Sequence, residues 1–127
     1  MAKQKNLLYI SLTGSFPDFS AVFHKYSFQA TSAHTMRKAL AIIKKQSPEL
    51  IVAEFVYAPT YGSQLSNFES LLAAMQSFAV NASLIALVYP DDIAHCRKVL
   101  RDCSRYVILN FPVNLQELEE HLAGQCD

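Results

Sequence analysis

The sequence has little cysteine and no long hydrophobic run, and each absence excludes a class of protein. Its three cysteines, Cys96, Cys103 and Cys126, form neither an even-numbered disulfide framework nor a Cys-x-x-Cys pair. No apolar stretch reaches the length that spans a membrane. The first apolar run breaks at Ser11, too early for a signal peptide. We therefore expect a cytoplasmic protein with reduced thiols and no membrane contact.

The chain also lacks net charge, because its eleven basic residues are balanced by eleven acidic ones. Nucleic-acid-binding domains need a surplus of Lys and Arg to meet the phosphates, so no nucleic acid partner is expected. Low net charge removes one barrier to self-association. No repeat, charged tail or Gly/Ser/Pro-rich linker interrupts the sequence, which predicts a single domain over residues 1–127.

Short apolar runs alternate with helical patterns along the whole chain. Five segments predict strands, at residues 7–12, 27–31, 50–55, 83–89 and 106–109. The runs at 7–12, 50–55 and 83–89 are apolar enough to be buried strands. A helical pattern follows each of the five segments, at residues 15–26, 34–46, 65–78, from Pro90 and from Leu115. Right-handed crossovers place helices on both faces of such a sheet. We predict an α/β fold with a doubly wound five-stranded parallel sheet, whose common strand order is 2-1-3-4-5.

Three local signals predict where helices begin and end. Pro17 suits the first turn of the first helix, where a missing N–H costs little. Asn114 and Glu117 have the spacing of a capping box at the start of the last helix. Gly124 is a suitable residue just beyond the end of that helix.

Two segments resemble the receiver domain of response regulators, the CheY-like superfamily. Residues 48–55 (Pro-Glu-Leu-Ile-Val-Ala-Glu-Phe), with Pro59 downstream, are similar to the strand that carries the phosphoacceptor Asp. Phe111-Pro112 is similar to the Lys-Pro pair before the last receiver helix, and Ala39-Leu40 matches a habitual pair in the second helix. The resemblance implies the same fold, a role in bacterial two-component (phosphorelay) signalling, and a cis peptide bond before Pro112.

The departures from the receiver pattern fall on the residues that handle the phosphoryl group. Ser11 and Leu12 stand where receivers hold Mg²⁺ with an acidic pair, and Glu54 stands at the phosphoacceptor position. The remaining positions, for the hydroxyl, the switch aromatic and the lysine, are Val88, Ile108 and Phe111. Phosphoryl transfer needs metal and cations against the developing charge, so a degenerate pseudo-receiver is expected, without enzyme activity, metal or cofactor.

Glu54 has two interpretations: a permanent mimic of the phosphorylated state, or a partly exposed carboxylate at a strand end. The loops at the same edge of the sheet carry aromatic residues, namely Phe16, Tyr57, Tyr61, Tyr89 and Phe111. These rings either bind a partner or small ligand, or fill the emptied pocket as core. The histidines and cysteines at 95, 96, 103 and 121 lack metal-ligand spacing, so no metal site is expected there.

The fourth and fifth helices carry opposite charges. Arg97 and Arg101, with Lys98 and Arg105 nearby, oppose Glu117 and Glu120, with Glu119 between them. This complementarity predicts a homodimer or partner face, and the alternative is two ordinary solvated surfaces.

Two functions from different classes follow. The first is a protein–protein interaction module in signal transduction that phosphorylation does not switch and that carries no output domain. The second is a small-ligand sensor that uses the aromatic edge of the sheet. A flavin fits this fold, but Thr13-Gly14-Ser15 is only a fragment of a phosphate-binding loop.

Overall fold

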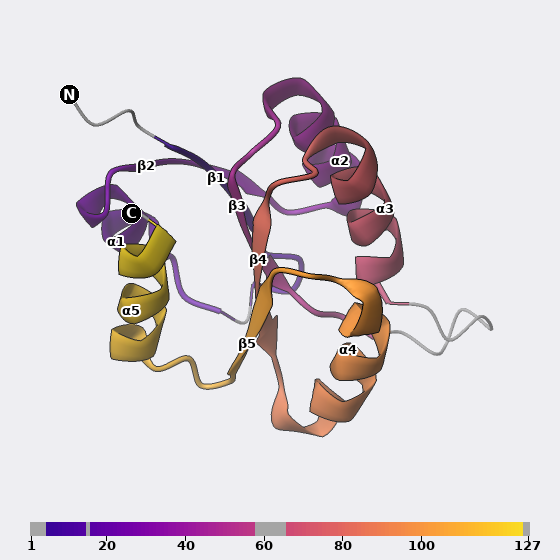
Figure 1. Cartoon of the computed structure of the whole chain (residues 1–127). Coiled ribbons are helices and arrows are strands. Elements are labelled where there is room, and N and C mark those ends of the chain that lie inside the picture. Colours follow the sequence, from indigo (N-terminus) through magenta and orange to yellow (C-terminus); the bar gives the residue numbers. More distant parts are fainter. Residues whose placement is uncertain (1–4, 15, 58–65, 126–127) are drawn as a thin grey trace.

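Five parallel strands form the centre of the molecule, which is described here by a computed structural model covering residues 5–14, 16–57 and 66–125. The strands are β1 (Lys5–Ile10), β2 (Phe28–Ala33), β3 (Leu50–Glu54), β4 (Ser83–Val88) and β5 (Tyr106–Asn110). Their order across the sheet is β2-β1-β3-β4-β5, so the predicted doubly wound order is confirmed (Figure 1).

Helices cover both faces of the sheet (Figure 1). α1 (Ser20–Lys25) and α5 (Leu115–Gln125) lie on one face, whereas α2 (Met36–Gln46), α3 (Phe68–Phe78) and α4 (Ile93–Val99) lie on the other. Two 3-10 turns flank α4, η2 (Pro90–Asp92) and η3 (Leu100–Asp102). No helix in the described ranges is long and apolar enough to cross a bilayer.

Each face of the sheet has its own core, because alternate side chains of a strand point to opposite faces. Leu8, Ile10, Ile51 and Ala53 pack under α2, α3 and α4, whereas Leu7, Tyr9, Leu50 and Val52 pack under α1 and α5. All five residues of β3 are buried, which explains why its sequence is a continuous apolar run that ends in Glu54.

Local capping interactions explain where several helices begin. The Thr35 side chain accepts a hydrogen bond from the Lys38 backbone N–H at the start of α2. Asn114 Oδ1 accepts from the Glu117 backbone N–H, 3.0 Å away, so the predicted cap of α5 is confirmed. The predicted cis peptide bond between Phe111 and Pro112 is also confirmed.

Two predicted helix boundaries are wrong. Gly124 lies inside α5, which continues to Gln125. Pro17 precedes α1 instead of occupying its first turn, because the helix begins only at Ser20. Asp18 Oδ1 accepts a hydrogen bond from the Ser20 backbone N–H, and this local turn occupies the residues expected to be helical.

Candidate functional site

Glu54 lies at the carboxyl end of the central strand, where ligands of open α/β sheets bind. Its side chain is only 1% exposed, so the interpretation as a partly exposed carboxylate is wrong. Oε1 accepts hydrogen bonds from the backbone N–H groups of Leu12 (3.0 Å) and Thr13 (2.8 Å). Oε2 accepts from the Thr13 hydroxyl at 2.7 Å. The loop after β1 therefore closes over the carboxylate and satisfies both of its oxygens.

This arrangement does not fit the magnesium ion that receivers bind. A hard cation requires several oxygen ligands, but Ser11 and Leu12 bring no carboxylate, and donors from the chain itself occupy both oxygens of Glu54. Within residues 5–14, 16–57 and 66–125, no three His, Cys, Asp or Glu side chains gather as a metal site would require.

Ser11 and Leu12, the two residues that follow β1, make contacts with the sheet and its core. Ser11 is buried, its backbone N–H donates to the Ala33 carbonyl at 3.0 Å, and its own carbonyl lies 3.1 Å from Nδ1 of His34. Leu12 is half-buried and packs against the core under α2, α3 and α4. Ser11 and Leu12, which stand where receivers have an acidic pair, thus make structural contacts within the chain.

Three rings close the edge of the sheet on the α1 and α5 side. Phe16, Tyr89 and Phe111 come from the loops after β1, β4 and β5. The ring centroids are 5.6 Å apart for Phe16 and Tyr89, 5.4 Å for Phe16 and Phe111, and 4.7 Å for Tyr89 and Phe111. Phe16 is buried and the other two are half-buried. Their mutual packing favours the interpretation in which the rings fill the space that a phosphoryl site would need.

The remaining residues of the predicted edge lie elsewhere. Tyr57 packs on the opposite face of the sheet, against His95 of α4, with a centroid distance of 3.9 Å. Val88 is fully buried, and Ile108 is half-buried in the same core. Tyr61 lies outside the described residues. These aromatic residues were predicted to share one edge of the sheet. Tyr57 instead lies on the opposite face from Phe16, Tyr89 and Phe111.

Asn67 is a residue of this edge that the sequence reasoning missed. It precedes α3, where its side chain forms no helix cap. Instead, Oδ1 accepts from the Val56 backbone N–H at 2.7 Å and Nδ2 donates to the Glu54 carbonyl at 2.8 Å. Asn67 thus fixes the chain that leaves β3, and nothing in its sequence context distinguishes this role from capping.

The charged residues of α4 and α5 lie on the surface. Arg97, Arg101, Glu117 and Glu120 are exposed. They form no ion pair with one another, since Lys25–Glu119 at 2.8 Å is the only ion pair among the described residues. Glu119 therefore pairs with Lys25 of α1, whereas Glu117 and Glu120 form no ion pair with any other described residue.

A shallow hollow of about 860 Å³ lies beside α4. Its lining combines basic and aromatic side chains with the two aspartates of η2, and includes Tyr57, His95, Arg97, Lys98, Arg101 and Tyr106. Tyr106 lies on the edge strand β5 and is 37% exposed. Aromatic and Arg side chains are enriched where proteins bind one another, so this hollow has the composition of an interface.

Neither described cysteine has the setting of a catalytic nucleophile. Cys96 is fully buried, and burial, reinforced by the charge of Asp92, raises the pKa of its thiol to about 12. A thiol with so high a pKa is protonated at neutral pH and unreactive. Cys103 is half-buried and, like Cys96, forms no disulfide.

The strand order and the two helical layers are those of the CheY-like, doubly wound α/β fold. No known family model matches the sequence, and no curated protein matches it. The fold is similar to that of the receiver domain of AraT, a response regulator from Geobacillus stearothermophilus, with 12% identity, a TM-score of 0.73, and coverage of 98% of this chain and 94% of the other.

Two further solved structures are similar over nearly their whole length. A response regulator receiver protein from Pseudomonas putida shares 16% identity, with a TM-score of 0.72 and coverage of 98% of this chain and 99% of that one. The receiver domain of the Francisella response regulator 1452 shares 19% identity, with a TM-score of 0.68 and 97% coverage of both chains. Similarity at such low sequence identity establishes the fold. The function has to be inferred from the residues of the candidate site.

Proposed function

We propose that this chain is a receiver-like module of bacterial-type two-component signalling that acts by binding other proteins and is not switched by phosphorylation. The observation that carries the proposal is the closed environment of Glu54. Its two oxygens accept hydrogen bonds from Leu12 and Thr13 of the same chain, so neither is free for a metal ion or a phosphoryl donor. We place this module in the cytoplasm, where its free thiols stay reduced.

The groups around Glu54 support the same proposal. Charge on a transferring phosphoryl group must be met by cations or hydrogen-bond donors. The two positions that supply them in receivers are Val88, which is fully buried, and Phe111, which packs against Phe16. Neither side chain offers a donor or a charge, so the proposed module has no enzymatic role.

Mg²⁺ with beryllofluoride, a phosphoryl analogue, is therefore expected to leave the melting temperature unchanged. A ligand that binds the folded state raises its stability, so binding would appear as a shift. Acetyl phosphate with Mg²⁺ should likewise leave the intact mass unchanged. A phosphorylatable receiver in the same buffer is the positive control, and Glu54→Asp tests whether the receiver residue alone restores a response. A shift that requires both metal and analogue in the wild type would overturn the proposal.

The surface that we assign to partner binding is the α4 hollow together with the exposed edge of β5. For a homodimer, the exposed Arg97 of α4 and Arg101 of η3 would meet Glu117 and Glu120 of a second copy. Complementary charge of this kind steers association and suppresses wrong partners. These side chains are exposed and form no ion pair within residues 5–14, 16–57 and 66–125, which supports their assignment to a partner surface.

Charge reversal tests this surface. The double variant Arg97→Glu/Arg101→Glu is expected to weaken self-association by about tenfold, since two like-charge contacts replace two attractive ones. Adding Glu117→Arg/Glu120→Arg should restore association by swapping the charges. Sedimentation equilibrium over a concentration series measures the mass. If the wild type stays monomeric at every concentration, the homodimer is excluded and a different protein must be the partner.

The second function considered, a small-ligand sensor at the aromatic edge, receives no support from the geometry there. Phe16, Tyr89 and Phe111 pack on one another at 4.7–5.6 Å. This close packing of the three rings leaves them in contact with one another and favours their role as core.

A further inference from the structure

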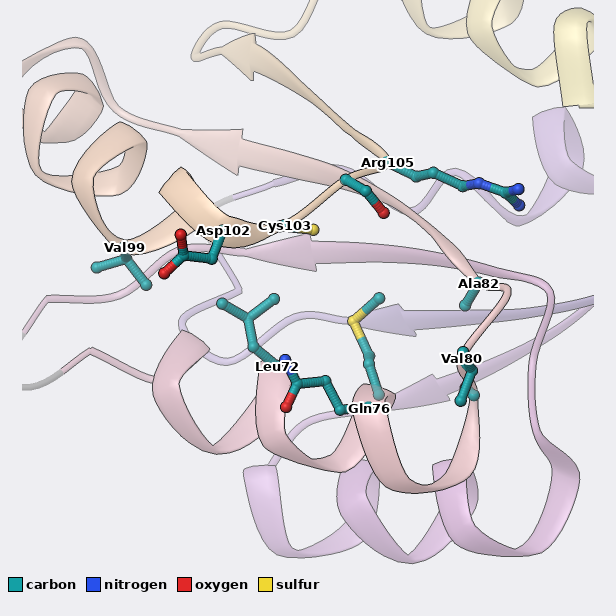
Figure 2. A pocket seen from close by; sticks show the side chains of 11 residues that line it. Leu72, Gln76, Val80, Ala82, Val99, Asp102, Cys103 and Arg105 are labelled. Carbon is teal, nitrogen blue, oxygen red and sulfur yellow. The ribbon is translucent and has the colours of Figure 1, made fainter.

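A cavity of about 260 Å³ lies at the opposite edge of the sheet from Glu54. It is enclosed by the second half of α3, the turn that leads into β4, the end of α4, and the segment between η3 and β5 (Figure 2). This edge holds the amino ends of the strands, so the cavity shares no residue with the candidate site described above.

The cavity has mainly apolar walls. Met75, Ala79 and Ala82 are buried side chains that line it, and Leu72 and Val99 are half-buried ones. An apolar cavity of about 150 Å³ holds a benzene molecule. The volume here suits one aromatic ring with a short chain, which is smaller than the usual drug-sized ligand.

Two charged side chains line the cavity, those of Asp102 and Arg105. Figure 2 shows the Asp102 side chain next to Val99 and across from Leu72, whereas the Arg105 side chain lies at the other end of the cavity, on the side of Ala82. Nη1 of Arg105 donates a hydrogen bond to the Asn81 carbonyl at 3.2 Å, which holds it there. Asp102 takes part in no ion pair among the described residues. At the end of the cavity beside Val99, the charge offered to a ligand is therefore that of the Asp102 carboxylate.

The turn beside the cavity also exposes apolar surface. Val80, which lines the cavity, is 74% exposed, and Phe78, two residues earlier, is 43% exposed. Large apolar side chains left in water cost free energy, and a group of them beside a cavity marks a binding surface more often than isolated ones do. The apolar walls thus extend to the outside of the molecule.

From these observations we infer that the cavity binds a small apolar amine, with the ring or alkyl body against Leu72, Met75 and Ala82 and the ammonium group beside Asp102. The apolar walls supply most of the affinity, because burial of apolar surface is the main driving force. The exposed carboxylate adds selectivity for a cation over a neutral or anionic ligand of the same shape.

Three probes of nearly equal shape test the inference: 2-phenylethylamine, 2-phenylethanol and 3-phenylpropionate. Each is titrated into uniformly ¹⁵N-labelled protein, and amide chemical shifts are followed. We expect saturable shifts at residues 79–82 and at Cys103, with the amine binding about threefold more tightly than the alcohol. Asp102→Asn should remove that threefold preference and leave the affinity for the alcohol unchanged.

A volume-filling variant provides an independent check. Cys103→Leu extends an apolar side chain into the cavity and should weaken all three probes by about tenfold, whereas Cys103→Ser, which keeps the volume, should not. Leu72→Phe repeats the test from α3 in case the first variant melts at a lower temperature. The inference is overturned if the acid binds best, if filling has no effect, or if no probe shifts the spectrum below about 10 mM. Shifts that follow protein concentration alone would assign the cavity to a second copy.

Discussion

Glu54→Ala is expected to lower the free energy of unfolding by about 3 kcal/mol, since a hydrogen bond to a charged group contributes about 1.5–3 kcal/mol and neighbouring bonds are not additive. The variant removes three hydrogen bonds at once, from the Leu12 N–H, the Thr13 N–H and the Thr13 hydroxyl. It also leaves a void at a position that is 1% exposed. Urea unfolding followed by circular dichroism measures the loss.

Two further variants separate the carboxylate from its surroundings. Glu54→Gln keeps an oxygen that can accept from both backbone N–H groups, so it should cost only about 1 kcal/mol, the loss of charge assistance. Glu49→Ala removes an exposed carboxylate just before the same strand and should stay within about 0.5 kcal/mol of the wild type. If Glu54→Ala costs no more than Glu49→Ala, the carboxylate does not hold the loop and is available to a ligand.

The bonds of Glu54 also bear on the idea that it mimics a phosphorylated residue. A mimic has to present its charge to partners at the surface or to the switch positions. Glu54 instead directs both oxygens at the loop after β1, where they accept from two backbone N–H groups and the Thr13 hydroxyl. These hydrogen bonds connect the end of β3 to the loop between β1 and α1 in the interior of the protein.

The order of elements could be predicted because buried parallel strands are continuous apolar runs. Residues 50–55 and 83–89 show such runs, and the observed strands Leu50–Glu54 and Ser83–Val88 differ from them by one residue each. Helix starts were less predictable. They depend on which side chain bonds to the backbone at the start of the helix. Asp18 accepts from the N–H of Ser20, so α1 begins later than predicted, and Asn67 bonds to Val56 and Glu54 instead of capping α3.

The site was only partly predictable, because its decisive contacts join residues far apart in the sequence. The positions of Glu54, Ser11 and Leu12 could be assigned from the receiver resemblance. The burial of Glu54 could not be predicted. Its carboxylate accepts hydrogen bonds from backbone N–H groups 41 and 42 residues away, and a backbone group leaves no signal in the sequence. The pairing of Glu119 with Lys25 could not be predicted either, because the two residues are 94 positions apart in the sequence.

Tyr9, two residues before Ser11 on β1, gives the site a pH dependence at alkaline pH. Burial raises the pKa of its hydroxyl from 10.0 to about 12, and the charges of Glu54 and Asp18 add to this, while a hydrogen bond with Ser11 acts in the opposite direction. In the unfolded chain the same hydroxyl ionises near pH 10, so above that pH only the unfolded state loses the proton. Stability is therefore complete below about pH 10 and falls as pH rises toward 12, by up to about 2.7 kcal/mol.

Tyr9→Phe is expected to lower the free energy of unfolding at neutral pH and to raise it, relative to the wild type, near pH 12. At neutral pH it removes the hydrogen bond from the Tyr9 hydroxyl to the Pro17 carbonyl, 3.0 Å long, and should cost about 1 kcal/mol. Near pH 12 the variant should be more stable than the wild type by about 1.5 kcal/mol, because phenylalanine has no proton to lose. Urea unfolding of both proteins at a series of pH values measures the difference, and a tyrosinate absorbance titration should lack the group with the highest pKa in the variant. A difference that stays constant with pH would show that Tyr9 ionises as easily in the folded protein as in the unfolded chain, which its burial beside Glu54 argues against.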